Sequence, residues 1–161
     1  DVRVTDGADF DLDASAFLLG QDEKVVDATK GMVFFNNMDF SGVRLTGDNR
    51  TGAGEGDDEQ VKIDLSAVPA SVSKIAIAVT IYDGAARGQS FGMVSKSYCR
   101  VVNDADGSEL ARLDLQEDAS TERAMIMGEI YRNGDEWKFR AIAQGYEDQA
   151  KLATNFGISL G

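Results

Sequence analysis

Two acidic segments carry most of the side chains that could do chemistry in this sequence. The first is Asp9-Phe10-Asp11-Leu12-Asp13, where strand alternation would place the three aspartates on one face and the apolar pair on the other. The second segment, residues 47–59, combines four glycines with five carboxylates and the amide of Asn49. Glycine lets a backbone wrap closely around a ligand, and these side chains supply oxygen atoms. Together the two segments predict a site for a hard cation.

Repulsion among eight neighbouring carboxylates is the physical argument for a bound cation. Two unit charges about 4 Å apart cost roughly 1 kcal/mol in water and about 4 kcal/mol at an effective dielectric constant near 20. Arg50 is the only basic residue inside the second segment and cannot neutralise it. Calcium accepts about 6–8 oxygen ligands, whereas magnesium demands stricter geometry and zinc and copper prefer softer ligands. We therefore expect one or two calcium ions here.

An ordinary solvated loop is the alternative interpretation of the acidic residues. Most acidic runs are solvated surface, but solvation alone does not require glycines interleaved with carboxylates. An EF-hand is excluded, because a loop starting at Asp9 would need glycine and glutamate at the positions of Ala14 and Gly20. The choice therefore lies between a calcium site of another kind and plain surface.

The overall composition excludes several classes of function. The chain has 161 residues, no histidine, one cysteine (Cys99) and a formal net charge of −12. Without histidine, the usual Ser-His-Asp, Cys-His and His-ligated zinc sites cannot form. The negative charge repels phosphate backbones, so nucleic acid is not an expected partner. A single cysteine forms no intrachain disulfide, which favours a reducing compartment.

No segment of the sequence has the length of a membrane span. The longest apolar stretch, residues 75–82, is too short to cross a bilayer, and no signal peptide precedes it. We therefore predict a soluble protein without a transmembrane segment. Because the chain begins with Asp1 and not with methionine, we expect an excised domain whose upstream segment could be missing.

Short alternating or apolar runs, separated by turn residues, predict an all-β fold. The run from Lys74 to Tyr82 is apolar at odd and even positions alike, which is typical of a central strand buried on both faces. Glycine-containing turns predict two hairpins after it. We expect a single domain over residues 1–161, a two-sheet β-sandwich with a short C-terminal helix. The expected elements are strands over 10–19, 32–36, 60–65 and 74–82, hairpins of 97–103 with 109–115 and of 124–132 with 136–144, and a helix over 146–155.

The second acidic segment resembles the signature loop of the TerD family, the tellurium-resistance and chemical-stress proteins. The family pattern is GDN-x-TG-x-G-x-GDDE, and residues 47–59 read GDNRTGAGEGDDE. The blocks cover nearly the whole chain, so the sequence is identified as a member of that family. The other matching blocks are DGADFDLDASAFLL at 6–19, FFNN at 34–37, LSAVPASVSKI at 65–75, EDASTERAMIMGEIYR at 117–132 and WKFRAIAQGY at 137–146.

The resemblance implies a cytoplasmic β-sandwich that binds two calcium ions through acidic loops and has no established enzymatic activity. Family members usually carry a further stretch, with an early strand, before the position of Asp1. The residues that the family pattern implicates as metal ligands are Asp11, Asp13, Asp48, Asn49, Glu55, Asp57, Asp58 and Glu59, with Asn36 and Asn37 as further oxygen donors.

We therefore expect a calcium-binding, non-enzymatic adaptor or scaffold protein of a bacterial tellurite-resistance and chemical-stress response system. The expected partners are other stress-response proteins of the same system, with the inner face of the membrane as one place of assembly. A calcium-dependent membrane-surface module is the alternative, although the acidic segments lack the basic or aromatic rim that such a module needs. A metal-assisted hydrolase is disfavoured, because the sequence shows neither a histidine nor another positioned base.

Overall fold

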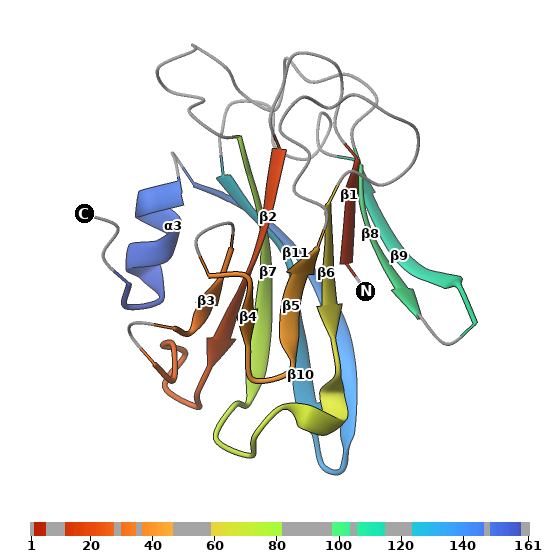
Figure 1. Cartoon of the computed structure of the whole chain (residues 1–161). Coiled ribbons are helices and arrows are strands. Elements are labelled where there is room, and N and C mark those ends of the chain that lie inside the picture. The colour runs from red at the N-terminus through yellow and green to blue at the C-terminus, as the bar shows by residue number, and fades with distance from the viewer. Residues whose placement is uncertain are drawn as a thin grey trace.

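The structure is a computed structural model of the 161-residue chain. It describes residues 2–5, 12–27, 30–34, 37–46, 59–81, 98–103, 106–114, 124–146 and 149–158. These residues form two antiparallel β-sheets that face each other, with a short α-helix near the C-terminus (Figure 1). The predicted two-sheet β-sandwich with a C-terminal helix is confirmed.

The first sheet has six strands: β1 (Val2–Thr5), β4 (Asp39–Phe40), β5 (Val43–Thr46), β6 (Glu59–Ile63), β8 (Tyr98–Asn103) and β9 (Ser108–Asp114). Their order across the sheet is β4-β5-β6-β1-β8-β9. β1 joins the two halves of this sheet, because Val2 pairs with Val61 of β6 on one side and with Val101 of β8 on the other.

The second sheet has five strands: β2 (Leu12–Leu19), β3 (Met32–Val33), β7 (Lys74–Ile81), β10 (Ala124–Asn133) and β11 (Glu136–Tyr146). Their order is β11-β10-β7-β2-β3, which places β7 at the centre. Outside the sheets lie a turn of 3-10 helix, η1 (Leu65–Ala67), and the helix α3 (Gln149–Asn155).

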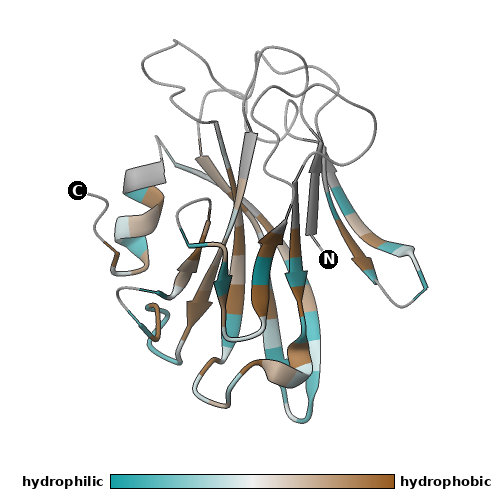
Figure 2. Cartoon of the chain, viewed as in Figure 1, coloured by the Kyte–Doolittle hydropathy of each residue, from teal (hydrophilic) through white to brown (hydrophobic). Residues whose placement is uncertain are grey.

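The main hydrophobic core lies between the two sheets. β2 and β7 contribute alternate residues to it, and β5 and β6 cover these residues from the first sheet. Figure 2 shows hydrophilic and hydrophobic bands alternating along β5 and β6, as expected when one face of a strand is buried and the other is wet. Among the buried members are Leu18, Leu45, Val61, Ile75, Ile77, Met125 and Met127.

A second apolar cluster covers the outer face of the second sheet, on the side away from the first sheet. Phe17 and Leu19 of β2 belong to this cluster, as do Leu152 and Ala153 of α3. The rings of Phe17 and Phe156 also pack against each other at a tilt, with centroids 4.8 Å apart. β2 and β7 are therefore buried on both faces, which confirms the prediction made from the apolar run of residues 74–82.

The hairpins follow the predicted pattern, while several short strands were not predicted. β8 pairs with β9 and β10 with β11, as expected from the turns between them. β1, β4 and β5 were missed, because two to four residues are too few to establish a strand period. The helix begins at Gln149, a little later than expected.

A tight turn links two of the strands that were missed. Phe40 pairs directly with Val43, so Ser41 and Gly42 form a two-residue hairpin loop. Their φ angles are 49° and 90°, the left-handed values that a type I′ turn requires at both positions. The turn at Ser41-Gly42 therefore fixes the register between β4 and β5.

Candidate functional site

The strands that flank the acidic segments end at one and the same end of the sandwich. β2 begins at Leu12 opposite Ile81, the last residue of β7. In the first sheet, Thr46 at the end of β5 pairs with Gln60 near the start of β6. All these strand ends lie at the upper end of the molecule in Figure 1. The strand ends next to both acidic segments therefore lie at a common end of the sandwich.

The strands that follow the two acidic segments belong to sheets that face each other. β2 contacts β1, β5 and β6 across the sandwich, and residues of β2 and β6 share the core between the sheets. The start of β2, which carries Asp13, and the start of β6, which is Glu59, are therefore brought to the same end from opposite layers. Sequence alone shows that both segments are acidic, and the fold adds that their ends converge.

Only three of the ten predicted metal ligands, Asp13, Asn37 and Glu59, lie within the described residues. Asp13 lies in β2, where it pairs with Thr80, and Glu59 lies in β6, where it pairs with Val4. Within the described ranges, no group of three or more acidic or cysteine side chains is placed to hold a metal ion. The other candidates, apart from Asn37, lie outside the described residues: Asp11, Asn36, Asp48, Asn49, Glu55, Asp57 and Asp58.

The side-chain amide of Asn37 has a structural contact. Its nitrogen donates to the backbone carbonyls of Lys30 and Met32 at 3.0 and 2.9 Å. Backbone hydrogen bonds in both directions between Phe34 and Asn37 close the same turn. The amide nitrogen therefore holds the turn after β3, while the amide oxygen stays a predicted ligand.

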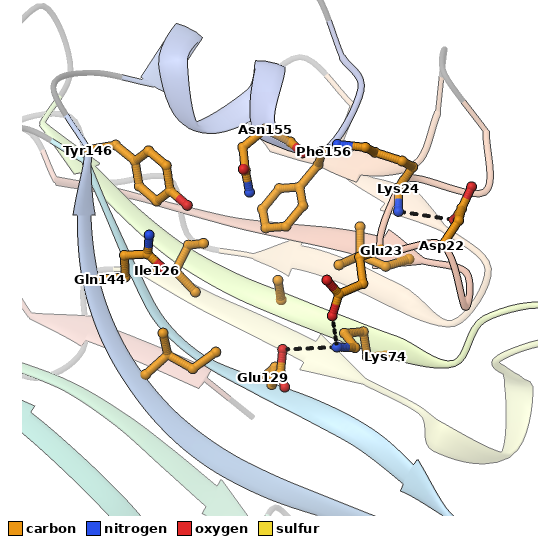
Figure 3. Close-up of a pocket in the computed structure, with 13 residues that line it drawn as sticks. Asp22, Glu23, Lys24, Lys74, Ile126, Glu129, Gln144, Tyr146, Asn155 and Phe156 are labelled. Carbon is orange, nitrogen blue, oxygen red and sulfur yellow. Dashed lines mark hydrogen bonds and ion pairs between the residues drawn. The ribbon is translucent and has the colours of Figure 1, made fainter.

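A separate cavity of about 260 Å³ lies on the outer face of the second sheet, between the sheet, the loop after β2 and the end of α3 (Figure 3). We call it the helix-side cavity. Leu19, Ala76, Ile126, Ile142 and Phe156 supply its apolar lining. The polar side chains around it are Asp22, Glu23, Lys24, Lys74, Glu129, Gln144, Tyr146 and Asn155.

Lys74 lies between two carboxylates at the edge of the helix-side cavity. Its ammonium is 2.7 Å from Oε1 of Glu23 and 3.6 Å from Oε2 of Glu129. Glu129 also accepts a hydrogen bond from the Arg140 guanidinium. The side chain of Glu129 is 8% exposed, whereas that of Glu23 is 70% exposed. Glu129 is therefore a fixed anchor, and Glu23 is a weakly held surface group.

A β-bulge explains why Glu129 faces this cavity. Ile126 pairs with Ala78 of β7, but the next paired residue is Gly128, opposite Ile77, so Met127 is the extra residue. The bulge shifts the alternation by one, and Glu129 comes to pair with Ala76 on the outer face. Without this shift, the strand period would direct the carboxylate into the core beside Met127.

The loop after β2 is fastened to the end of α3. The Lys24 ammonium donates to the Asn155 carbonyl at 2.6 Å, and the Val25 amide donates to the Phe156 carbonyl at 3.0 Å. Within this loop Glu23 has φ +63°, a left-handed conformation that costs a residue with a Cβ about 1–2 kcal/mol. The strained residue is the one whose carboxylate reaches over the cavity to Lys74.

Local contacts shift three pKa values around the cavity. The hydrogen bond from Lys74, together with the charge of its ammonium, holds the pKa of Glu23 below its ordinary value. The hydrogen bond to Glu129 raises the pKa of Arg140. Burial raises the pKa of the Tyr146 hydroxyl. At neutral pH Glu23 is therefore a carboxylate, Arg140 a charged guanidinium and Tyr146 a neutral phenol.

Sequence reasoning did not identify the helix-side cavity. Two signals were present: Lys74 opens an apolar strand, and Glu129 interrupts the apolar run 124–130. A charge inside a strand that is otherwise buried on both faces needs a partner. The partners lie in other elements, and only the strand order brings Glu23, Lys74 and Glu129 together.

Comparisons with known proteins agree on one family. The TerD domain family matches residues 1–156. Tellurium resistance protein TerD of Serratia marcescens is 55% identical over 162 residues, which cover 99% of this chain and 84% of that protein. General stress protein 16U of Bacillus subtilis (strain 168) is 49% identical over 158 residues, covering 96% and 81% of the two chains.

The same fold occurs in solved structures. A homologue of telluride resistance protein (TerD) from Streptomyces coelicolor A3(2) superimposes with a TM-score of 0.79, covering 94% of this chain and 92% of that chain at 22% identity. This likeness supports the β-sandwich architecture. Among the described residues, no helix has the length and apolar character needed to cross a membrane.

Proposed function

The chain belongs to the TerD family of tellurium-resistance and stress-response proteins, and from this membership we propose that it is a calcium-binding, non-enzymatic adaptor. In this proposal about two calcium ions are held by oxygen atoms of the acidic segments. The protein works in the cytoplasm, where it assembles with other proteins of the same stress-response system.

The observation that carries the proposal is the position of the strands that flank the two acidic segments. The strands that flank them end at the same end of the sandwich and belong to facing sheets. Carboxylate and amide oxygens are the ligands that calcium takes, and no histidine or paired cysteine competes for a softer metal. Carboxylates held close together repel one another unless a cation lies between them.

The acidic residues would act by ordering this end of the sandwich when the cation binds. Two divalent ions would offset four of the twelve excess negative charges. With repulsion removed, the two segments can be held together and present one surface to a partner protein. Metal occupancy would thereby be linked both to stability and to partner binding.

The first test is calcium titration of chelator-treated protein by calorimetry, with magnesium as the control and thermal unfolding recorded in parallel. We expect saturable binding that is selective for calcium, together with a higher melting temperature. A stably folded protein that binds no calcium would contradict the proposal. That result would assign the acidic segments to solvated surface.

A second test separates an adaptor from a membrane-surface module. Liposomes with and without anionic phosphatidylserine are sedimented with the protein, in calcium and in chelator. An adaptor should stay in the supernatant under all four conditions. Co-sedimentation that needs both calcium and the anionic lipid would contradict the adaptor assignment.

A further inference from the structure

We propose that the helix-side cavity binds a small monocarboxylic acid with a compact apolar body, and that Glu23 occupies the position of its carboxylate when the ligand is absent. The residues that line the cavity include none of the predicted calcium ligands. The two sites are therefore independent, and either one can be disproved without the other.

The charge balance of the cavity favours an anion over a cation. Lys74 is the group against which a ligand carboxylate would lie, and its ammonium already bridges Glu23 and Glu129. Once Glu23 turns away, the charged lining consists of Lys24, Lys74, Asp22 and Glu129, and Glu129 is also paired with a cation outside the lining, Arg140. A positive ligand would be repelled, because Glu129 already contacts two of these cations.

Glu23 is suited to be displaced. Its carboxylate is 2.7 Å from the Lys74 ammonium, the distance expected for a bound carboxylate. Its side chain is nevertheless 70% exposed, and exposed ion pairs contribute little to stability. The left-handed backbone at Glu23 adds strain, a feature that accumulates at ligand sites. A carboxylate held inside the cavity would be less solvated and would pair more strongly with Lys74.

The remaining lining limits the size and character of the ligand. A volume of about 260 Å³ is small for a ligand site and suits a molecule of about ten non-hydrogen atoms. Ile126, Ile142 and Phe156 would contact its apolar body. Figure 3 shows Gln144 and Tyr146 at one side of the cavity and Glu23 and Lys74 at the other, so the carboxylate has one preferred end.

Phenylacetate is the probe, and phenylacetamide, its uncharged analogue of the same shape, is the control. Each is titrated into the ¹⁵N-labelled full chain while amide resonances are followed by NMR. We expect phenylacetate to shift the amides of Ala76, Ile126 and Phe156 saturably, with a dissociation constant of about 0.1–5 mM. Phenylacetamide should bind at least about tenfold more weakly, because it has no charge for Lys74.

Two variants test the role assigned to Glu23. Glu23→Gln removes the competing carboxylate and should tighten phenylacetate binding about two- to fivefold, the range expected when an exposed ion pair no longer competes. Glu109→Gln is the matched control, because Glu109 also pairs with an exposed cation, Arg112 at 2.8 Å, but lies outside the cavity. It should leave binding unchanged.

Lys74→Met should weaken phenylacetate binding at least about tenfold, since the cation against which the carboxylate would lie is lost. If this variant fails to fold, the change in phenylacetate affinity in Glu23→Gln decides between the outcomes. The proposal is overturned if phenylacetamide binds as tightly as phenylacetate, if no amide around the cavity shifts, or if Glu23→Gln behaves like Glu109→Gln.

Discussion

Gly128 and Arg140 approach each other across β10 and β11 so closely that a Cβ atom on Gly128 would lie 2.6 Å from the Arg140 carbonyl oxygen. The same atom would lie 2.7 Å from the ring of Phe139. This close contact follows directly after the bulge that turns Glu129 toward the helix-side cavity. The position needs glycine for space and not for backbone freedom, since its φ is not positive.

Gly128→Ala should destabilise the fold by about 2–3 kcal/mol, because neither backbone nor core ring can move away cheaply. Gly134→Ala is the control: Gly134 has φ +65°, but a Cβ atom added there would meet no other atom within 4 Å. Only backbone strain of about 1 kcal/mol is therefore expected in the control. Urea unfolding of both variants gives the comparison. Equal losses of unfolding free energy in the two variants would show that β11 moves to accommodate the added methyl group.

Glu129→Gln should destabilise the protein by about 2 kcal/mol, the usual loss for a hydrogen bond to a buried charged group. The glutamate is buried and pairs with two cations, Lys74 and Arg140. Glu109→Gln is the control: Glu109 also lies near two cations, Arg112 and Arg100, but its side chain is 37% exposed, so its loss should change the unfolding midpoint little. The measurement is again urea unfolding. A Glu129→Gln protein as stable as the Glu109→Gln protein would show that the buried pair contributes nothing.

How far the fold can be read from sequence depends on how local its signals are. The doubly apolar run from Lys74 to Tyr82 and the two hairpin turns depend on neighbouring residues, and they predicted strands correctly. β1 has only four residues and obtains its stability from β6 and β8, about 60 and 100 residues away. No pattern among neighbouring residues indicates that β1 pairs with β6 and β8.

The acidic segments and the helix-side cavity also differ in how far local sequence signals identify them. Charge density alone identifies the acidic segments, but the common end shared by the strands that flank them depends on strand order. The cavity was missed because alternation from Met125 and Met127 would place Glu129 in the core. A one-residue bulge reverses that assignment. Gly128 is the only local hint, since glycine inside a strand often marks a bulge.

The Glu23 carboxyl should titrate below its ordinary pKa of 4.5, because Lys74 donates a hydrogen bond to its charged form. The contact therefore stabilises the fold above pH 4.5, and its contribution is lost as the pH falls through the folded-state pKa. Carboxyl ¹³C NMR measures the titration directly. In Lys74→Met the pKa should return toward 4.5, and an unchanged value would assign the shift to another cause.

Arg132 should resist replacement by lysine. Its Nε donates to the Val72 carbonyl at 2.8 Å, and its Nη2 donates to the carbonyls of Val68 and Pro69 at 3.2 and 3.1 Å. The guanidinium also lies 4.2 Å from the centre of the Trp137 ring. A lysine ammonium cannot reproduce this planar arrangement.

Arg132→Lys should therefore lower the free energy of unfolding by about 2 kcal/mol and speed hydrogen exchange in residues 65–73. Fluorescence of the single tryptophan reports the unfolding. Arg112→Lys, in an exposed pair with Glu109, is the control and should change little. Equal stability of the two variants would show that the three carbonyl contacts of Arg132 are replaceable.

The double substitution Asp57→Asn/Asp58→Asn should stabilise the protein in chelator and destabilise it in calcium. In chelator the variant should melt above the unchanged protein, because two repelling charges are gone from the acidic end. In calcium it should melt below the unchanged protein, because ligands are lost and the ion no longer stabilises the fold. Asp135→Asn/Glu136→Gln removes the same charge from the exposed β10–β11 turn, at the other end of the sandwich. This control should retain the full calcium-dependent rise in melting temperature. If both double variants respond alike, net charge and not a bound ion governs the stability, and the calcium site is refuted.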